Sequence, residues 1–149
     1  VAVPQTENGA GGSYYYQDLL QDDYMGLINC AYAGTAGDGE SPEEHAEKSV
    51  ARLTGNKTKP QDLSVEKNSG YSEALGCPVY ILTYTTGRNE DTSVWKVFMT
   101  EADGYTYLYA FSVWADAYAD REDTIDEVFG QLCFSQKSGK RVLCTRTKR

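Results

Sequence analysis

The sequence has only one histidine, His45, and this scarcity limits the catalytic chemistry open to the chain. A nucleophilic triad needs a base beside its nucleophile, and nothing in the sequence places His45 next to a serine or a cysteine. His45 stands in the first turns of an expected helix, so we interpret it as a solvated or half-buried helix residue. Motifs of the types G-x-S-x-G, H-E-x-x-H, G-x-G-x-x-G and the Walker loop are absent. We therefore expect no catalytic residue of these classes and no cofactor.

Basic residues are scarce outside the last part of the chain. Residues 1–136 contain 8 Lys and Arg against 22 Asp and Glu, which is a net charge of −14, whereas residues 137–149 contain 6 basic residues and no acid. An acidic body repels phosphate backbones, so we expect no binding to nucleic acid. The segment 137–149 is expected to be a basic tail that contacts an anionic surface, folds onto the acidic body, or is simply a frayed end.

Long apolar runs are also missing. No stretch of about 18 apolar residues exists, so we expect no transmembrane segment. Residues 1–13 are rich in Gly, Pro and Asn and predict a flexible N-terminal linker. This start fits a secreted or surface domain released from a signal or a membrane tether, and a trimmed cytosolic chain fits nearly as well. The length of 149 residues suits a single domain, which we place at residues 14–136.

The four cysteines form no C-x-x-C pair, and with one histidine they make no zinc pattern. Their even number favours an oxidising compartment and hence an extracytoplasmic location. Cys133 with Cys144 is the short-loop disulfide, and Cys30 with Cys77 would then join two distant segments. Buried free thiols are the alternative.

The clearest predicted element is a β-hairpin. Residues 93–101 and 105–114 are rich in strand formers, and Asp103-Gly104 between them is a strong type I′ turn signal. Cross-strand partners share a face, so this turn makes both faces of the hairpin apolar. A sheet with one wet face would alternate between apolar and polar residues, so this sheet must be covered on both faces. One face carries Val94, Phe98, Tyr105, Tyr107, Tyr109, Phe111 and Val113, and the other carries Trp95, Val97, Met99, Leu108 and Ala110.

Two helices are available to cover the sheet. Ser41-Pro42-Glu43-Glu44 is a capping box that begins a helix to about Leu53, and residues 121–133 carry a stripe of apolar side chains at helical spacing. The sequence therefore predicts an α+β fold, an antiparallel β-sheet covered by helices on both faces. Further strands are expected at residues 14–20, 25–32, 63–67, 71–75 and 78–86.

This order of elements resembles the Mog1/PsbP-like α-β-α sandwich. The resemblance covers about residues 14–136 and rests on the S-P-E-E helix, the Y-I-L-T-Y-T-T-G strand, the tyrosine-rich hairpin and the C-terminal helix near F-G-Q-L-C-F-S. Small bacterial surface lipoproteins of unassigned function are similar. The resemblance implies a non-enzymatic protein, because one branch of the family binds a small nuclear GTPase and another docks on the lumenal side of photosystem II.

The aromatic row of the hairpin is the main candidate binding surface. Tyr105, Tyr107 and Tyr109, with Tyr80 or Tyr84 from a neighbouring strand, would form a platform for a protein or a glycan at the sheet face or edge. The alternative is that this row is core beneath a helix. We therefore favour a non-catalytic binding module.

Clusters of acidic residues support a second hypothesis, a hydrolase that uses carboxylates alone. A metal site at Asp116, Asp120 and Asp123 is a further alternative, although acids near a helix start are common because they stabilise its dipole. A third hypothesis is an accessory regulator of a larger assembly, as in the family that the chain resembles.

Overall fold

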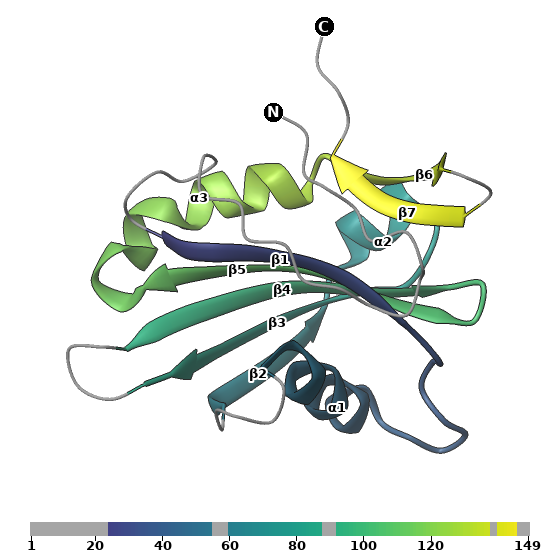
Figure 1. Cartoon of the computed structure of the whole chain (residues 1–149), viewed down its shortest axis with the longest axis horizontal. Coiled ribbons are helices and arrows are strands. Elements are labelled where there is room, and N and C mark those ends of the chain that lie inside the picture. The colour runs from purple at the N-terminus through teal and green to yellow at the C-terminus, as the bar shows by residue number, and fades with distance from the viewer. Residues whose placement is uncertain (1–23, 55–59, 88–91, 138–139, 146–149) are drawn as a thin grey trace, which may run out of the picture.

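The computed structural model describes residues 24–54, 60–87, 92–137 and 140–145. Five strands form an antiparallel sheet in the order β1-β5-β4-β3-β2, and two more form the separate hairpin β6–β7 (Figure 1). The predicted linker 1–13 and the predicted strand 14–20 lie outside the described residues. The elements are β1 (Tyr24–Ala33), α1 (Pro42–Thr54), β2 (Gln61–Lys67), α2 (Ser69–Leu75), β3 (Val79–Thr86), β4 (Ser93–Ala102), β5 (Tyr105–Trp114), a 3-10 turn (Ala115–Ala117), α3 (Tyr118–Phe129), β6 (Leu132–Lys137) and β7 (Lys140–Thr145).

The central hairpin has the predicted register. Ala102 pairs with Tyr105 and Phe98 pairs with Tyr109, as expected for a two-residue turn at Asp103-Gly104. Both turn residues have positive φ, 55° for Asp103 and 83° for Gly104, which a type I′ turn requires. The register assigns every β4 and β5 side chain to the face that the sequence predicted.

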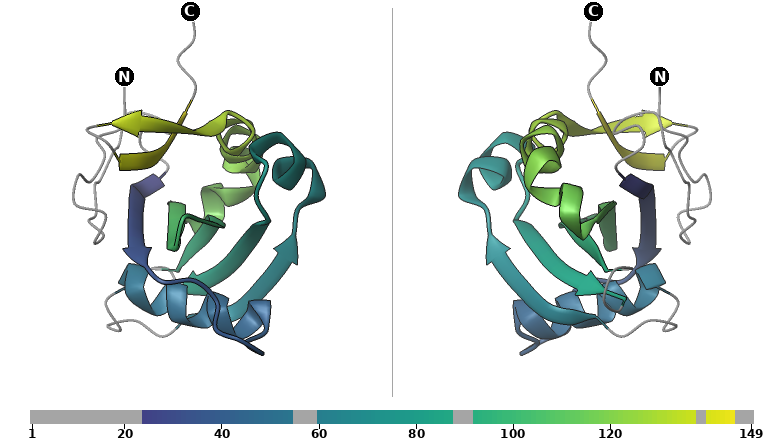
Figure 2. Two further views of the ribbon diagram at one scale, coloured as in Figure 1. Left: turned by 90° about the vertical axis from the view of Figure 1, so that its right-hand side faces the viewer. Right: turned by 90° about the vertical axis from the view of Figure 1, so that its left-hand side faces the viewer.

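Both faces of the sheet are covered, which confirms the predicted layers. Helix α1 lies across one face, and α3, α2 and the β6–β7 hairpin lie over the other (Figures 1 and 2). The α3 face packs Phe98, Phe111 and Phe129 into one core, and the α1 face packs Val50, Leu82 and their neighbours into a second. The sheet is therefore the middle layer, because neither of its faces can be left in water.

The capping box forms as predicted at the start of α1. The Glu44 backbone N–H donates to Ser41 Oγ at 3.1 Å, and the Ser41 N–H donates to Glu44 Oε1 at 3.0 Å. These reciprocal bonds satisfy two backbone donors that the first turn leaves open. Among the described helices, none is long and apolar enough to cross a membrane.

One predicted strand is wrong: residues 71–75 belong to α2. Asn68 is the N-cap and accepts the Tyr71 N–H at 2.8 Å. Gly76 ends the helix in the left-handed conformation with a φ of 84°. The two caps stabilise a seven-residue helix in a segment whose apolar residues are spaced too sparsely to predict it.

The C-terminal boundary is also corrected. The second helix ends at Phe129 rather than near Cys133, and the chain continues into β6 and β7. Residues 140–145 thus form a strand within the expected basic tail, and Leu143 of that strand is buried at 1% exposure. The domain boundary predicted at residue 136 is therefore too early. Short apolar runs on either side of Ser138-Gly139, L-C-F before it and V-L-C after it, were the signal for this hairpin.

Candidate functional site

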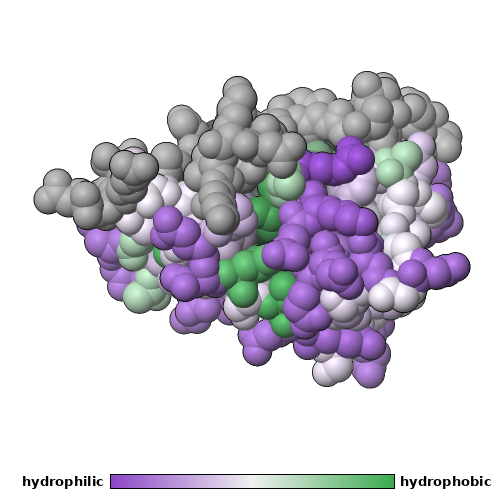
Figure 3. Space-filling model, turned by 90° about the horizontal axis from the view of Figure 1, so that it is seen from below, coloured by the Kyte–Doolittle hydropathy of each residue, from purple (hydrophilic) through white to green (hydrophobic). Residues whose placement is uncertain are grey.

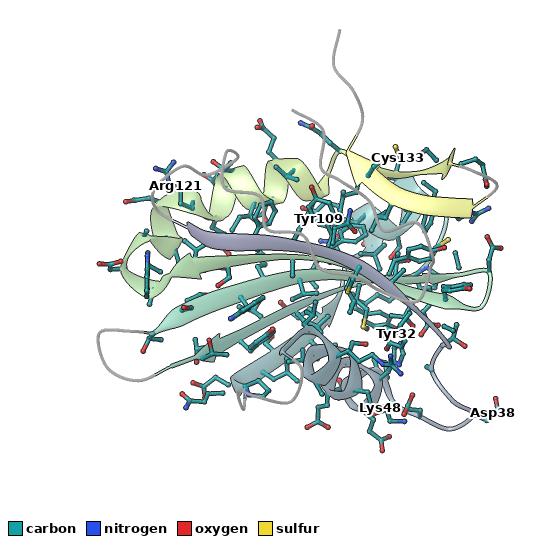
Figure 4. All side chains as sticks on the ribbon, viewed as in Figure 1. Tyr32, Asp38, Lys48, Tyr109, Arg121 and Cys133 are labelled. Atoms are coloured by element: carbon teal, nitrogen blue, oxygen red, sulfur yellow. The ribbon has the colours of Figure 1, made fainter. Side chains whose placement is uncertain are left out.

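The predicted aromatic platform is divided between the two faces of the sheet. Tyr105, Tyr107 and Tyr109 lie on the α3 face, whereas Tyr80 and Tyr84 lie on the α1 face. Tyr84, Tyr107 and Tyr109 are buried at 1%, 5% and 0% exposure, so they are core residues (Figure 4 labels Tyr109). Tyr80 and Tyr105 are half-buried, but they point to opposite sides. The five tyrosines therefore do not form one surface for a ligand.

A hollow lies where α2 meets the β6–β7 hairpin, with a volume of about 380 Å³. Its walls are formed by the end of α2, by β6 and by β7. Both apolar and polar groups line it, and one of them is a guanidinium. The lining residues are Ala74, Leu75, Cys133, Phe134, Ser135, Gln136 and Arg141.

Arg141 is the charged group of this hollow, and its guanidinium is held over an aromatic ring. Its Cζ atom lies 5.0 Å from the centre of the Phe134 ring, a cation–π contact between the two strands of the hairpin. Its Nε atom lies 3.0 Å from Asp103 Oδ2 in the β4–β5 turn. That pair lacks hydrogen-bond geometry, and Nε has no hydrogen-bond acceptor among the described residues. The Arg141 side chain is 34% exposed.

The core positions this hairpin. The Phe134 ring packs edge-on against Tyr107, with ring centres 5.0 Å apart. Asn29 of β1 donates from Nδ2 to the Leu143 carbonyl oxygen at 3.1 Å, which ties β7 to the edge of the main sheet. Burial, together with the nearby Asp103 carboxylate, raises the pKa of Tyr107. Phe134 and Arg141 are therefore fixed from below, while their outer sides face the hollow.

Phe134 and Arg141 were not among the predicted site residues, because residue 141 was assigned to a tail. The charge reversal after residue 136 was visible, but nothing in the sequence showed that the basic segment folds back beside α2.

His45 is buried rather than solvated, which corrects the interpretation of a half-exposed helix residue. Its Nε2 atom lies 2.7 Å from Glu101 Oε2 and 3.2 Å from Thr106 Oγ1, and its Nδ1 atom lies 3.5 Å from Glu40 Oε1. The nearest serine, Ser49, donates to the His45 backbone carbonyl instead of to the ring. The histidine thus joins α1 to the central hairpin, and the hydroxyl that it contacts, Thr106 Oγ1, itself donates to the Gly34 carbonyl oxygen at 2.8 Å.

Glu40, in the loop before α1, also belongs to this polar joint, which we define as His45, Glu101, Thr106 and Glu40. It accepts hydrogen bonds from the Gly37 N–H, at 3.0 Å, and from Lys48 of α1. The Lys48 hydrogen bond, with that of Gly37, lowers the pKa of Glu40. The carboxylate is therefore charged at neutral pH and balanced by its own neighbours.

Lys96 is a second buried charge, on the opposite face. Its Nζ atom donates to Asp126 Oδ1 at 2.7 Å and to Glu122 Oε2 at 3.0 Å, both on α3. Burial alone would lower the pKa of Lys96, but the hydrogen bonds to the two carboxylates outweigh it, so its pKa is raised. The Lys96 hydrogen bond lowers the pKa of Glu122 against the opposing effect of burial. Tyr118 also donates to Glu122 Oε2, at 3.1 Å.

The acidic clusters do not form the alternative sites. Asp116, Asp120 and Asp123 do not converge, and no group of three His, Cys, Asp or Glu side chains suited to a metal ion occurs in the described part of the chain. Glu122 and Asp126 hold Lys96 between them.

None of the four cysteines is in a disulfide in the structure. Cys30 belongs to the α1 face, whereas Cys77 lies between Leu75 and Val79, which both pack on the α3 face. The predicted bond between Cys30 and Cys77 is therefore not formed, because the sheet separates the two faces. Burial raises the pKa of the Cys30 thiol to about 11. Cys133 and Cys144, in contrast, are direct cross-strand partners.

A strip of apolar side chains reaches the surface beside the hydrophilic side chains of the α1 face (Figure 3). Half-buried residues of that face that pack on its core are Cys30, Leu63, Val65, Tyr80 and Trp95. Trp95 stacks in parallel on Tyr84, with ring centres 5.7 Å apart, and donates from Nε1 to Thr86 Oγ1 at 3.1 Å. These contacts hold the indole in place as part of the core edge.

No family model and no curated protein sequence matches the chain. Solved structures are nevertheless similar to it. CyanoP, the cyanobacterial PsbP of Synechocystis sp. PCC 6803, aligns with a TM-score of 0.52 at 16% identity, over 86% of this chain and 77% of that chain. PA94, a protein of unknown function from Pseudomonas aeruginosa, aligns with a TM-score of 0.45 at 11% identity, over 92% of this chain and 82% of that chain. At 16% identity the likeness to CyanoP concerns the fold alone, and the chain has the Mog1/PsbP-like α+β fold that its sequence pattern resembles.

Proposed function

We propose that this chain is a non-catalytic binding module and that it contacts a protein partner through the hollow between α2 and β6–β7. The observation that carries the proposal is the Arg141 guanidinium, held over Phe134 at the hollow. Arginine in such a position binds carboxylates through paired hydrogen bonds, and the nearby Leu75 and Phe134 accept an apolar group. The partner segment we expect therefore places an acidic group beside an apolar side chain.

The charge distribution supports an acidic partner segment. Residues 137–149 carry 6 basic residues, against a net charge of −14 for residues 1–136. Lys137 and Lys140 are the paired ends of β6 and β7, next to Arg141 in the ladder. These three basic residues make the hairpin the part of the described chain that we expect to attract an anionic segment.

The arrangement favours a protein over a glycan. Sugars stack on exposed aromatic platforms, and the half-buried Tyr80 and Tyr105 lie on opposite faces of the sheet. The role of an accessory regulator, which the resemblance implies, is one form of this proposal in which the partner is a subunit of a larger assembly. The fold shared with CyanoP is compatible with such a role.

A carboxylate hydrolase is the weaker candidate, because the buried titratable side chains are engaged within the chain. His45 is bonded to Glu101 and Thr106, and Lys96 is bonded to Glu122 and Asp126. Chromogenic glycosides and esters test this alternative directly: turnover that E122Q or E101Q abolishes would favour the enzyme.

We further propose an extracytoplasmic location, with a membrane tether in the native precursor as the alternative to secretion. The even number of cysteines and the opposed pair Cys133 and Cys144 support it. Fractionation of the native host, with an antibody to the chain, tests the location: recovery in the cytosol would contradict it.

A peptide-display library screened against the pure chain tests the binding function. Selected peptides should share an acid next to a large apolar residue, and R141Q should weaken their binding by about tenfold or more. R52Q is the matched control, because Arg52 also lies over a ring, 4.1 Å from the centre of Tyr32, but on the α1 face. Equal loss in R141Q and R52Q, or peptides with no acid, would contradict the proposal.

A further inference from the structure

Cys133, which lines the hollow, faces a second cysteine across the β6–β7 hairpin. Cys133 of β6 and Cys144 of β7 are paired in the antiparallel register. Directly opposed residues of such a pair have Cα atoms about 4.5–5.5 Å apart, and disulfides bridge Cα separations of about 4.4–6.8 Å. The backbone therefore needs no rearrangement for the two sulfurs to bond.

Alternation along the strands places both side chains on one side of the hairpin. Leu132 and Leu143, their neighbours in sequence, are buried in the core at 4% and 1% exposure. Cys133 and Cys144 therefore point away from the core, and both are half-buried, so a small reagent can reach them. Cys144 Sγ lies 3.4 Å from Ser135 Oγ, which is on the same side. Figure 4 shows Cys133 on the hairpin, above the main sheet.

We propose that Cys133 and Cys144 form a reversible disulfide that fixes the β6–β7 hairpin. The oxidant we assign is a low-molecular-weight disulfide such as oxidised glutathione. One cysteine thiolate attacks a sulfur of the oxidant and releases one small thiol, and the second cysteine then displaces the other. Two protein thiols and one small disulfide thus become one protein disulfide and two small thiols, so protons and electrons balance.

The other cysteines compete poorly for this bond. Cys30 lies on the far face of the sheet, and burial raises the pKa of its thiol to about 11, which keeps its thiolate scarce at neutral pH. Cys77 precedes β3 at the end of α2 and has no place in the β6–β7 ladder.

The disulfide would also regulate peptide binding at the hollow, and this part of the inference rests on the proposed function. Phe134 and Arg141 both lie in the segment that the bond closes, between Cys133 and Cys144. Closing the loop holds the two strands in register and keeps the guanidinium over the ring. The oxidised chain should therefore bind an acidic peptide more tightly than the reduced chain.

The bond can be tested in a C30S/C77S variant, which keeps only the proposed pair. After incubation with oxidised glutathione and removal of it, iodoacetamide should label neither cysteine, and the mass should be lower by two hydrogens with no glutathione adduct. Thermal unfolding of the oxidised form should occur about 5–10 °C above that of the reduced form. A C133S change in the same background is the control, and it should leave a mixed disulfide on Cys144.

Two results would overturn the disulfide. Glutathione adducts on both cysteines without a bridge would show that the sulfurs do not meet, and peptide mapping of the wild-type chain that finds Cys77 in the bond would assign it elsewhere. If the bond forms but R141Q does not alter peptide binding, the disulfide stands and the proposed function of the hollow fails.

Discussion

His45 Nε2 lies 2.7 Å from Glu101 Oε2, so the only histidine of the chain is bonded to a carboxylate from the far end of β4. The same Glu101 oxygen accepts the Ala36 N–H at 2.9 Å, which brings the loop before α1 into the joint. Helix α1 is therefore attached to the sheet by a polar contact as well as by its apolar stripe. This role for the histidine is structural, and it predicts effects on stability instead of on turnover.

Substitution H45A should lower the free energy of unfolding by about 1–3 kcal/mol, because it leaves Glu101 and Thr106 without their shared partner. A double-mutant cycle with E101Q should show a coupling of about 0.5–3 kcal/mol, since the two side chains are in direct contact. Chemical denaturation monitored by tryptophan fluorescence measures both. E47Q, an exposed residue on the same helix, is the control and should change stability by less than about 0.5 kcal/mol. An H45A protein as stable as wild type would show that the joint contributes nothing.

Two substitutions of Lys96 should have very different effects on the stability of the protein. K96A removes the charge and the buried stem, and we expect a loss of about 2–4 kcal/mol. K96M keeps most of the volume, and Glu122 and Asp126 are 45% and 43% exposed, so water can replace the ammonium. We therefore expect K96M to lie within about 1 kcal/mol of wild type. Urea unfolding curves of the two variants compare them, and equal losses would mean that the ion pair, not the stem, stabilises the fold.

The Lys96 site also predicts how stability depends on pH. The pKa of Glu122 is lower in the folded state than its usual 4.5, so its contribution is complete above that value and is lost as the pH falls through the folded-state pKa. The pKa of Lys96 is raised above its usual 10.5, so its contribution is present below that value and is lost only in stronger alkali.

The stability difference between wild type and K96M should therefore be constant from about pH 5 to 9 and should shift against wild type in acid. Unfolding midpoints measured from about pH 3 to 9 check this prediction. In the K96M background, E122Q should change the pH dependence of the unfolding midpoint only slightly, because the Lys96 hydrogen bond that lowers the pKa of Glu122 is already lost. A difference that is unchanged down to pH 3 would contradict the assigned pKa of Glu122.

Tyr84 is expected to tolerate the loss of its hydroxyl. The Tyr84 Oη atom is buried and has no hydrogen-bond partner among the described residues, and burial raises its pKa. Y84F should therefore leave stability within about 0.5 kcal/mol of wild type or increase it, because an unpaired polar atom is removed from the core. Y71F is the matched control: the Tyr71 hydroxyl donates to the Asp126 carbonyl at 3.1 Å, and its loss should destabilise the protein by about 1 kcal/mol. A larger loss in Y84F than in Y71F would contradict this assignment.

Local patterns predicted the centre of the fold correctly. The Asp-Gly turn has one favoured geometry, and that geometry fixes which residues of β4 and β5 share a face. The capping box at Ser41 and Glu44 is equally local, since its two hydrogen bonds join residues three apart. The prediction of two covering layers followed from these patterns, because apolar side chains on both faces need partners.

The pattern was insufficient where an element is short. Helix α2 is only seven residues long. It is stabilised by its caps, Asn68 and Gly76, and by contacts such as that of Tyr71 with Phe129. The β6–β7 hairpin was hidden by its charge, because Lys137, Lys140 and Arg141 are typical of a solvated tail. Both elements are held mainly by contacts with the core, which local propensity does not contain.

The sequence alone was sufficient for the antiparallel sheet, its central register and its two covered faces, because turn geometry and side-chain alternation act over a few residues. Only the tertiary structure decided that the tyrosine row is core, that His45 is buried against Glu101, and that Arg141 lies over Phe134 beside α2. These relationships join residues that are distant in the chain. They depend on how the layers pack and on which polar groups become buried and therefore need hydrogen-bond partners. Local sequence patterns predict neither of these.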